Sequence, residues 1–376
     1  MTKVVLAINS DVGKPGKIGM RTYHIAKVCL EKNALVKIFC RSAYAKDIPR
    51  RLYYVPFLQK TISLFIRAMN LRVLTPKKQV QSQNKVLGIF DFWVRRHMPP
   101  CDIFHTWEYL EKSLQKAKTQ GIQTILDIQM APVLYVDGKP TPYQKAAYLK
   151  YPELIDYFIA PSEFTKDILL QLHIPEEKIF LVPFGVDTAI FRPTETKKEK
   201  FICMFAGTLC ERKGTRLLLQ AWEELNLQDA ELVLCGNIKK EFRGTLHTYK
   251  NRLKNLRTTG SISENKLMRE YQQASIFVFP SLVEGSAKVT YEALACGLPV
   301  VTTKNAGSVV EDGVSGYIIP DMDVQSIKEK MRYLYDNPQE TIRIGKNARL
   351  RAEQYTWKHY GENIMELYER IKTCTR

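Results

Sequence analysis

A chain of 376 residues is too long for one typical hydrophobic core and suits two domains of roughly 150 to 200 residues each. Its hydrophobic content of 45% supports a globular fold, and no run of eighteen uncharged apolar residues occurs, so no membrane span is expected. The formal net charge is +17, with most of the excess in residues 1–190, which hold 27 Lys and Arg against 16 Asp and Glu.

The eight cysteines stand singly, with no Cys-x-x-Cys pair, and the Met-Thr-Lys start lacks the pattern of a signal peptide. We therefore expect reduced, mostly buried thiols in a cytoplasmic protein, with attachment to the inner face of the membrane as an additional location. None of the six histidines pairs with another at metal-ligand spacing, so neither a metal nor another cofactor is expected.

The first half opens with a strand, a glycine-rich turn and a helix. Lys3–Ile8 is a β-branched apolar run, and Gly13, Gly16 and Gly19 precede a helical pattern that continues to Leu30. Strand and helix segments then alternate, which predicts a parallel sheet with helices on both faces. These segments are Leu35–Cys40, Asp102–His105, Ser113–Lys118, Thr124–Ile128, Tyr157–Pro161, Glu163–Leu172 and Lys178–Val182.

The most basic stretch is 48–98, where ten Lys and Arg face Asp91 as the single acidic residue. Such a charge attracts anionic lipid, nucleic acid or a phosphorylated acceptor, and it equally suits a solvated face that keeps the protein soluble. Within the stretch, an apolar stripe at helical spacing suits either an interfacial helix on anionic lipid or packing against the first sheet. The stripe consists of Phe57, Leu58, Ile62, Phe65, Ile66 and Met69.

A charged segment without apolar residues, 194–200, is interpreted as an interdomain linker. The alternation restarts after it with a strand at Phe201–Ala206, a helix at Thr215–Leu225 and a strand at Glu231–Cys235. Two strand-first α/β units joined by a linker predict a protein with two Rossmann-like domains facing across a cleft. Ligands of open α/β sheets bind at the carboxyl ends of the strands.

Between the first strand and helix of the second unit lies a glycine turn with two adjacent cations. Gly207 follows the strand directly, and Arg212 and Lys213 precede the helix. Lys supplies a point charge and Arg a planar fork for phosphate oxygens, beside the free amides of a helix start. A solvated surface pair is the alternative interpretation, and the strand-turn-helix context favours phosphate binding.

The segment 281–300 places two carboxylates, Glu284 and Glu292, on either side of a glycine-led helix start. Ile276–Phe279 reads as a buried strand, and Ala287–Ala295 as a helix closed by Gly297 and Pro299. The free amides at Gly285, Ser286 and Ala287, together with the helix dipole, suit a phosphate, and the two carboxylates suit sugar hydroxyls. An ordinary amphipathic helix with one buried and one solvated glutamate is the alternative.

This segment closely resembles the nucleotide-sugar site of glycosyltransferase family 4. The marker of that family is two glutamates eight positions apart, followed by Ala-Leu/Met-Ala-x-Gly-x-Pro-Val. The residues of this chain that match it are Glu284, Glu292, Ala293, Ala295, Gly297, Pro299 and Val300. The resemblance extends over residues 1–372, strongly after Val182 and weakly before it.

The resemblance implies the GT-B fold and four segments of the chain. These are an acceptor-side domain at 1–193, a linker at 194–200, a nucleotide-sugar domain at 201–354, and a helix at 355–376 that returns to the first domain. It also implies three catalytic residues: Arg212 and Lys213, which hold the donor diphosphate and stabilise its charge as it departs, and Glu284, which holds donor-sugar hydroxyls. Glu292 would hold the ribose. Gly207, and Gly16 of the first domain, would approach the phosphates, and a plain turn is the alternative interpretation for Gly16 and Gly19.

The chain departs from the family pattern at three positions. The usual arginine after the first glycine is Thr208, the usual asparagine before Gly185 is Phe184, and the usual histidine near position 129 is absent. Gln129 can donate a hydrogen bond to a sugar hydroxyl but cannot take a proton. We therefore expect a phosphate oxygen of the leaving group to take the acceptor proton.

Two further polar features have ordinary explanations. Asp321-Met322-Asp323 has the Asp-x-Asp form by which the GT-A fold binds a divalent metal, but Asp323 precedes a predicted helix and suits an N-cap. His105, at the end of a predicted strand, suits either the acceptor cleft or a buried, hydrogen-bonded position in the core.

The predicted function is transfer of a sugar from a nucleotide diphosphate sugar to an acceptor hydroxyl, and the resemblance to family 4 implies retention of the anomeric configuration. Sugar, lipid-linked or protein-linked acceptors of cell-envelope polysaccharide, glycolipid or glycoconjugate synthesis are the expected partners. An epimerase, hydrolase or phosphorylase with similar phosphate contacts is one alternative. A non-enzymatic protein that binds an anionic surface or nucleic acid is another, which rests on charge alone because no nucleic-acid-binding motif is present.

Overall fold

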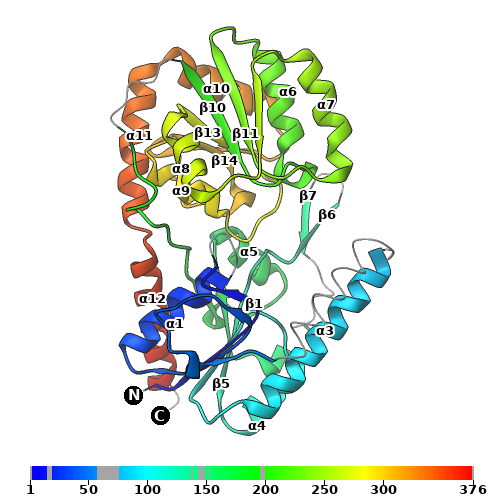
Figure 1. The fold of residues 1–376 in the computed structure, drawn as a ribbon, viewed down its shortest axis with the longest axis vertical. Helices are drawn as coiled ribbons and strands as arrows, with labels where there is room; N and C mark the ends of the chain where they lie inside the picture. The colour runs from blue at the N-terminus through cyan, green and yellow to red at the C-terminus, as the bar shows by residue number, and fades with distance from the viewer. Residues whose placement is uncertain are drawn as a thin grey trace.

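A computed structural model of the chain describes residues 2–14, 19–56, 76–136, 139–142, 149–150, 152–194 and 200–374. These residues form two α/β domains, one from each half of the chain, which are the lower and upper lobes in Figure 1. The predicted apolar stripe at 57–69 and residues 195–199 of the predicted linker lie outside the described residues. Within them, no helix is both long and apolar enough to span a bilayer.

The N-terminal domain is built on a parallel sheet in the order β3-β2-β1-β4-β5-β8-β9. Its strands are β1 (Val4–Val12), β2 (Leu35–Ala43), β3 (Tyr53–Tyr54), β4 (Ile103–Thr106), β5 (Gln123–Asp127), β8 (Tyr157–Ala160) and β9 (Ile179–Leu181). The helices are α1 (Gly19–Glu31), α3 (Pro76–His97), α4 (Glu111–Thr119) and α5 (Glu163–Gln171), and a hairpin pairs β6 (Val133–Val136) with β7 (Lys139–Pro142).

Alternation along β1 explains how this sheet is covered on both faces. Val4, Leu6 and Ile8 join a core cluster with residues of α1, whereas Val5 and Ala7 join a second cluster on the opposite face with residues of α3 and α4. Successive side chains of a strand point to opposite faces, so a strand that is apolar at every position must be buried on both. The β-branched run that predicted a strand therefore becomes the centre of the sheet.

The C-terminal domain repeats this arrangement with a parallel sheet in the order β12-β11-β10-β13-β14-β15. Its strands are β10 (Phe201–Ala206), β11 (Ala230–Cys235), β12 (Leu256–Gly260), β13 (Ile276–Phe279), β14 (Val300–Thr303) and β15 (Gly316–Ile319). Its helices are α6 (Thr215–Leu225), α7 (Arg243–Arg252), α8 (Glu264–Gln273), α9 (Lys288–Ala295), α10 (Val324–Asp336) and α11 (Pro338–Glu353).

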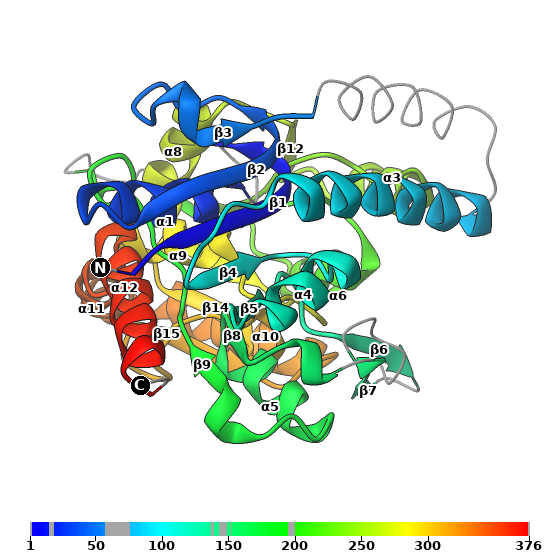
Figure 2. The ribbon, with the colours of Figure 1, turned by 90° about the horizontal axis from the view of Figure 1, so that it is seen from below.

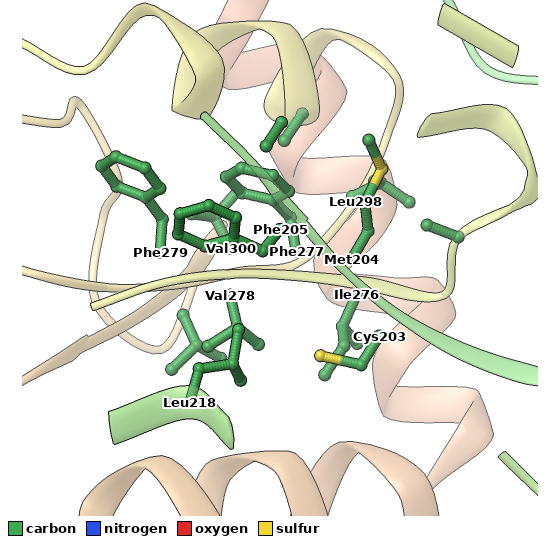
Figure 3. Packing of buried hydrophobic residues seen from close by; sticks show 14 of the residues in the cluster. Cys203, Met204, Phe205, Leu218, Ile276, Phe277, Val278, Phe279, Leu298 and Val300 are labelled. Carbon is green, nitrogen blue, oxygen red and sulfur yellow. The ribbon is translucent and has the colours of Figure 1, made fainter. Parts of the chain in front are cut away.

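Figure 3 shows how the centre of the second sheet is filled. Phe277 and Phe279 of β13 point to one face of the strand, and Val278 points to the other, toward Leu218 of α6. All four side chains are fully buried. Burial of this kind stabilises the fold by roughly 1.5 to 3 kcal/mol per large apolar side chain. It also fixes the carboxyl ends of β10 and β13, where the polar loops begin.

The last helix, α12 (Trp357–Cys374), leaves the second domain and packs against α1 of the first. Figures 1 and 2 both show the two helices side by side. The Trp357 and His24 rings stack with their centroids 4.4 Å apart, and Tyr368 donates or accepts a hydrogen bond of 2.6 Å with His105 Nδ1. His105 is fully buried, so the interpretation of this residue as a core histidine is confirmed.

The two sheets share one topology. Without the hairpin, the first sheet runs 3-2-1-4-5-6-7 in chain order, and the second runs 3-2-1-4-5-6. In this doubly wound arrangement the direction of winding changes between the first and fourth strands, and a crevice opens at that switch point. The switch points lie between β1 and β4 in the first domain and between β10 and β13 in the second.

Element boundaries differ from the predicted ones mainly at the ends. β1 continues to Val12 instead of ending at Ile8, because its register with β2 shifts between Ile8 and Asp11 and lets polar residues extend the pairing. The polar stretch Asn9 to Asp11 gives no apolar signal, so the sequence pattern could not include it. β13, β10 and α6 have the predicted bounds.

Candidate active site

The loop after β10 carries the predicted cations and is tightly constrained. Gly207 has φ +144° and donates its N–H to Cys235 O at 2.8 Å, while Gly214 has φ +67° and lies against the Pro280 carbonyl. Both backbone conformations favour glycine. Between them, residues 211–213 form a 3-10 turn that leads into α6. The Lys213 ammonium lies over the Phe279 ring, 4.9 Å from its centroid, and its side chain is therefore held at the sheet edge.

Glu284 follows β13 and receives both cations. Its Oε1 atom accepts hydrogen bonds from Lys213 Nζ at 2.7 Å, Arg212 Nη1 at 2.9 Å and Ser281 Oγ at 3.3 Å. The residue is 8% exposed, and its own amide donates to Asn305 O at 2.9 Å. A buried carboxylate needs paired charge. The structure thus brings together the three residues predicted as catalytic, Arg212, Lys213 and Glu284.

The pairing differs from the prediction in one respect, since the cations expected to hold a diphosphate hold Glu284. Arg212 also donates to the Val283 carbonyl, yet its side chain is 40% exposed. Lys213 is 15% exposed. The arrangement therefore presents a partly open guanidinium and a desolvated ammonium that share one carboxylate. An incoming phosphate would meet donors that are already positioned.

The helix start after Glu284 is less open than predicted. The Ala287 amide donates to Ala306 O at 2.9 Å, and the Ser286 hydroxyl donates to Gly307 O at 2.8 Å and lies 2.9 Å from Tyr291 Oη. The prediction of a free amide at Ala287 is wrong, because the chain folds back after β14 and its carbonyls take these donors. The helix α9 itself begins one residue later than predicted, at Lys288.

Glu292 lies inside α9 and is 4% exposed. Its carboxylate accepts a hydrogen bond of 3.2 Å from Tyr271 Oη and pairs with Lys288 Nζ at 3.0 Å. Burial works against the charged ammonium, but the charge and hydrogen bond of Glu292 raise the pKa of Lys288 overall. Sequence reasoning missed Lys288, although its i, i+4 spacing from Glu292 on a predicted helix was a usable signal.

Gly285 is the point at which the loop meets the N-terminal domain. Its carbonyl accepts hydrogen bonds from Ser162 Oγ at 2.5 Å and Thr165 Oγ1 at 3.1 Å, both at the start of α5. A side chain at Gly285 would strike the Gln129 carbonyl and would come within 2.9 Å of Met130 Cα. The residues after β13 therefore touch the residues after β5 and β8, and Gln129 lies beside the loop of Glu284.

Glu108 is a second residue that sequence reasoning missed. It follows β4 and is half-buried, and its two carboxylate oxygens lie 3.2 and 3.1 Å from the Asn9 amide nitrogen, which donates to them. Gln129 Nε2 donates to Trp107 O at 3.0 Å and reaches Glu108 Oε1 at 3.5 Å. Burial raises the pKa of the Glu108 carboxyl to about 7. A lone acidic residue two positions beyond a buried strand was the available signal.

The remaining predicted positions take ordinary structural roles or lie outside the description. Gly16 is outside the described residues. Asp323 accepts a hydrogen bond of 3.0 Å from the Ser326 amide, so its prediction as an N-cap is confirmed. Among the described residues, no group of three His, Cys, Asp or Glu is placed to hold a metal ion.

Comparison with known proteins identifies the part of the chain that holds this site. Residues 186–351 match the family model described as Glycosyl transferases group 1. The chain is 30% identical over 242 residues to an MMP alpha-(1->4)-mannosyltransferase of Mycolicibacterium hassiacum. The aligned residues cover 61% of this chain and 58% of that protein. The chain thus spans less than two thirds of that relative. Over 392 residues it is 24% identical to D-inositol 3-phosphate glycosyltransferase 1 of Catenulispora acidiphila, covering 95% and 91% of the two chains.

The fold as a whole is also that of solved structures. The chain superimposes on the sucrose-phosphate synthase of Thermosynechococcus elongatus with a TM-score of 0.70 at 17% identity, covering 99% of this chain and 100% of the other. At this identity the similarity establishes the fold alone. The predicted GT-B fold is confirmed, and within it the half of the chain that holds the candidate site is the part similar to the glycosyltransferase group 1 family.

Proposed function

We propose that this protein is a retaining glycosyltransferase that moves a sugar from a nucleotide diphosphate sugar to an acceptor hydroxyl. The observation that carries the proposal is the convergence of Arg212 and Lys213 on Glu284 at the carboxyl ends of β10 and β13. It lies in the group 1 domain, at the switch point where ligands of doubly wound sheets bind. The names of the relatives, a mannosyltransferase and an inositol-phosphate glycosyltransferase, agree with sugar transfer.

The two cations suit the departing diphosphate. Negative charge builds on its oxygens as the sugar bond breaks, and preorganised donors stabilise that charge without reorganising. The Lys213 ammonium is desolvated against Phe279, which strengthens its attraction to an anion. The start of α9 after Gly285 adds the positive end of a helix dipole. Ser286 and Ala287 shape this loop through their bonds to Gly307 and Ala306.

The carboxylates suit the hydroxyls of the donor. When a diphosphate takes up Arg212 and Lys213, Glu284 is released to accept hydrogen bonds from the sugar. Glu292, held by Lys288 and Tyr271, would bind the ribose. Gln129 has no basic nitrogen, so a phosphate oxygen of the leaving group would take the acceptor proton. Retention of the anomeric configuration rests on the resemblance to family 4.

A donor screen tests this proposal. We expect release of a nucleoside diphosphate from one member of a panel of nucleotide sugars, only when a cell-envelope extract supplies an acceptor. Mass spectrometry should then find the sugar attached to an acceptor. Release at the same rate without an acceptor, together with free sugar, would make the protein a hydrolase. A nucleotide sugar converted to its isomer would make it an epimerase.

The charge on the diphosphate would be offset by protein side chains, so we propose that transfer needs no added metal ion or cofactor. Arg212 and Lys213 supply two positive charges at one point, which supports this view. Transfer should then continue in excess EDTA at the rate measured before chelation. Loss of activity in EDTA and its recovery with one divalent cation would contradict this part.

We propose that the N-terminal domain, which would receive the acceptor, binds to the surface of an anionic membrane. The observation favouring this is the surface between α3 and α4, which hollows to about 670 Å³ and is lined by basic side chains and by Phe92, which is 50% exposed. Its basic residues are Arg95, Arg96, Lys112 and Lys116. Helix α3 extends away from the body of the lower domain in Figure 1.

Vesicle sedimentation tests the membrane contact. The protein should sediment with phosphatidylcholine vesicles that contain phosphatidylglycerol and should be released by salt. The double variant Arg95→Glu, Arg96→Glu should lose this binding. A matched variant of the other domain, Lys239→Glu with Lys240→Glu, changes charge equally at exposed positions and should retain it. Equal sedimentation of both variants would contradict the proposal.

A further inference from the structure

We propose that Glu108, supported by Asn9 and Gln129, forms a hydroxyl-binding site on the N-terminal side of the active site. Its ligand would be a hydroxyl of a sugar or polyol, from the donor sugar or from the acceptor. This inference rests on the proposed function and adds the group that receives the substrate on the first domain. It accounts for a carboxylate that the donor-binding residues leave unused.

The position of Glu108 is that of a ligand-binding residue. Asn9 belongs to β1, and Glu108 follows β4 by two residues, so the pair marks the switch point of the first sheet. Gln129 follows β5, and its carbonyl lies against Gly285, the residue next to Glu284. One residue, Gln129, therefore lies between the Glu108 carboxylate and the loop that carries Glu284 and Gly285.

The turn after β4 holds the carboxylate in place. Thr106 Oγ1 donates to the Glu108 carbonyl at 2.9 Å and accepts from the Glu108 amide at 3.3 Å. Thr106 is fully buried, so this turn is anchored in the core. Gln129 Nε2 fixes the same turn through Trp107 O at 3.0 Å. A site residue held by its own turn is prepared for a ligand before the ligand arrives.

The partners of Glu108 favour a hydroxyl over other ligands. The carboxylate meets amide donors and no directly bonded cation among the described residues. The charged groups of the neighbouring strands are Arg41 of β2 and Asp11 of β1, and they pair with each other at 2.8 Å. Arg41 acts on the Glu108 carboxylate only through its charge, which Asp11 largely offsets, so a phosphate would meet net negative charge here. A hydroxyl can donate a hydrogen bond to a carboxylate oxygen, which is what Glu108 offers, while Gln129 holds that carboxylate and the turn in position.

The raised pKa supports this view. A carboxyl with a pKa of about 7 carries a proton in part of the molecules at neutral pH, so it can exchange donor and acceptor roles with a hydroxyl. Natural sites often keep such a group at a cost in stability. If Glu108 only fixed the turn, replacing its carboxylate by an amide would leave binding and kinetics unchanged.

The test compares Glu108→Gln with wild type and with Glu111→Gln. Glu111 is a nearby acidic residue of α4 that pairs at 3.8 Å with Lys150. Affinities for UDP and GDP, and for UDP-glucose and GDP-mannose, are measured by calorimetry, and kinetics are measured with the donor and acceptor identified in the screen. We expect Glu108→Gln to keep the nucleoside diphosphate affinity and to lower kcat/KM about tenfold or more. Glu111→Gln should match wild type.

The pattern of losses identifies the source of the hydroxyl. Weaker binding of the nucleotide sugar with unchanged binding of the nucleoside diphosphate assigns the hydroxyl to the donor sugar. An increased KM for the acceptor alone assigns it to the acceptor. In either case we expect wild-type kcat/KM to rise with pH near 7, as Glu108 loses its proton and becomes a better acceptor, and we expect this rise to disappear in Glu108→Gln. Glu108→Asp, which keeps the carboxylate, should recover part of the activity and the pH dependence.

Two results would overturn the inference, and they differ in what else they remove. Wild-type affinities, kinetics and pH profile in Glu108→Gln, in a protein that transfers sugar, would refute the Glu108 site alone. Failure of the wild type to bind any nucleoside diphosphate or nucleotide sugar would refute the proposed function, and this inference with it.

Discussion

The two sheets of the molecule place a glutamate at the same topological point but surround it differently. Glu284, beside β10 and β13, shares one oxygen with an ammonium and a guanidinium within 3 Å. Glu108, beside β1 and β4, accepts a hydrogen bond from the backbone N–H of Asn9. The neighbouring cation Arg41 is already paired with Asp11. The first environment suits an anion that displaces the carboxylate, and the second suits a neutral hydroxyl.

Under the proposed function, one architecture would serve two substrates. Both switch points offer the carboxyl ends of parallel strands, and the local charge decides what each can bind. Gly285 joins them, because its carbonyl is held by Ser162 and Thr165 and its Cα lies against Gln129. Under the proposed function the two sites then face each other across one reaction space. We call Arg212, Lys213 and Glu284 the cationic wall. We call Glu108, Asn9 and Gln129 the wall of Glu108.

Gly285→Ala should have the largest effect, because it breaks the contact between the walls. The added methyl group would strike the Gln129 carbonyl and Met130 Cα, so the domains could not approach as they do. We expect kcat/KM for transfer to fall about a hundredfold or more, which corresponds to about 2.7 kcal/mol. Calorimetric binding of the nucleoside diphosphate should change much less.

Gly244→Ala is the matched control for that variant. Gly244 lies in α7 of the same domain, and an added Cβ would meet nothing within 4 Å. Activity should therefore remain at the wild-type level. If Gly285→Ala transferred sugar as fast as this control, the close approach of the two domains at Gly285 would be irrelevant to function.

Lys213→Ala and Glu284→Gln should have different effects on the binding of a nucleoside diphosphate at the cationic wall. Lys213→Ala removes a phosphate donor and should weaken nucleoside diphosphate binding about tenfold or more, about 1.4 kcal/mol. Glu284→Gln removes the competing anion, so nucleoside diphosphate affinity should stay equal or increase while kcat falls. Titration calorimetry and steady-state kinetics measure the two quantities.

Lys266→Ala, at an exposed position of α8, provides the comparison for a lost surface charge. It should bind and turn over as wild type does. Parallel weakening of nucleoside diphosphate binding in Lys213→Ala and Glu284→Gln would mean that the carboxylate supports the phosphate site instead of competing for its cations.

Glu108→Gln should change stability with pH in a defined direction. The pKa of Glu108 is raised from 4.5 to about 7 by burial, so the folded state binds the proton more tightly than the unfolded state. Stability from this group is complete below pH 4.5 and is lost as the pH rises toward 7. At pH 8 the variant should be more stable than wild type by about 1 to 3 kcal/mol. Urea unfolding at several pH values measures this difference.

The same stability curve for both proteins across pH 4.5 to 8 would show that Glu108 ionises as freely when folded as when unfolded. Its environment would then resemble solvent, and the contrast with Glu284 would lose its basis. Glu111→Gln serves again as the control, with no change expected in the pH dependence.

Ser162→Ala should have the smallest effect. It removes the 2.5 Å hydrogen bond to Gly285 O, but Thr165 still donates to that carbonyl at 3.1 Å. A single neutral hydrogen bond contributes about 1 kcal/mol, so kcat/KM should fall about threefold to fivefold. The double variant Ser162→Ala, Thr165→Ala should lose more than the sum of the single changes. An unchanged rate in the double variant would show that these bonds do not position the loop.

The cationic wall could be predicted from the sequence because its signals are local. Apolar runs at 201–206 and 276–279 end in glycine turns before helices, and each turn carries its own charged residues. Local pattern and position at the sheet edge therefore agree. The resemblance to family 4 added the roles of Glu284 and Glu292, and these roles stay predictions.

The wall of Glu108 could not be predicted, because its contacts join residues far apart in the chain. Asn9 and Glu108 are separated by 99 positions, and Gly285 meets Ser162 across 123. No periodicity encodes such pairs. The pKa of Glu108 depends on burial by several elements, which composition and spacing do not reveal. For the same reason, the Ala287 amide was expected to be free, since its partner Ala306 lies beyond the next strand.

The most direct test of the cationic wall is a crystal structure with a bound nucleoside diphosphate. The diphosphate oxygens should lie within hydrogen-bond distance of Arg212 Nη1 and Lys213 Nζ, with the Glu284 carboxylate turned away and the ribose at Glu292. A nucleotide bound elsewhere, with the pairs from Glu284 to Arg212 and Lys213 intact, would contradict the proposed donor site.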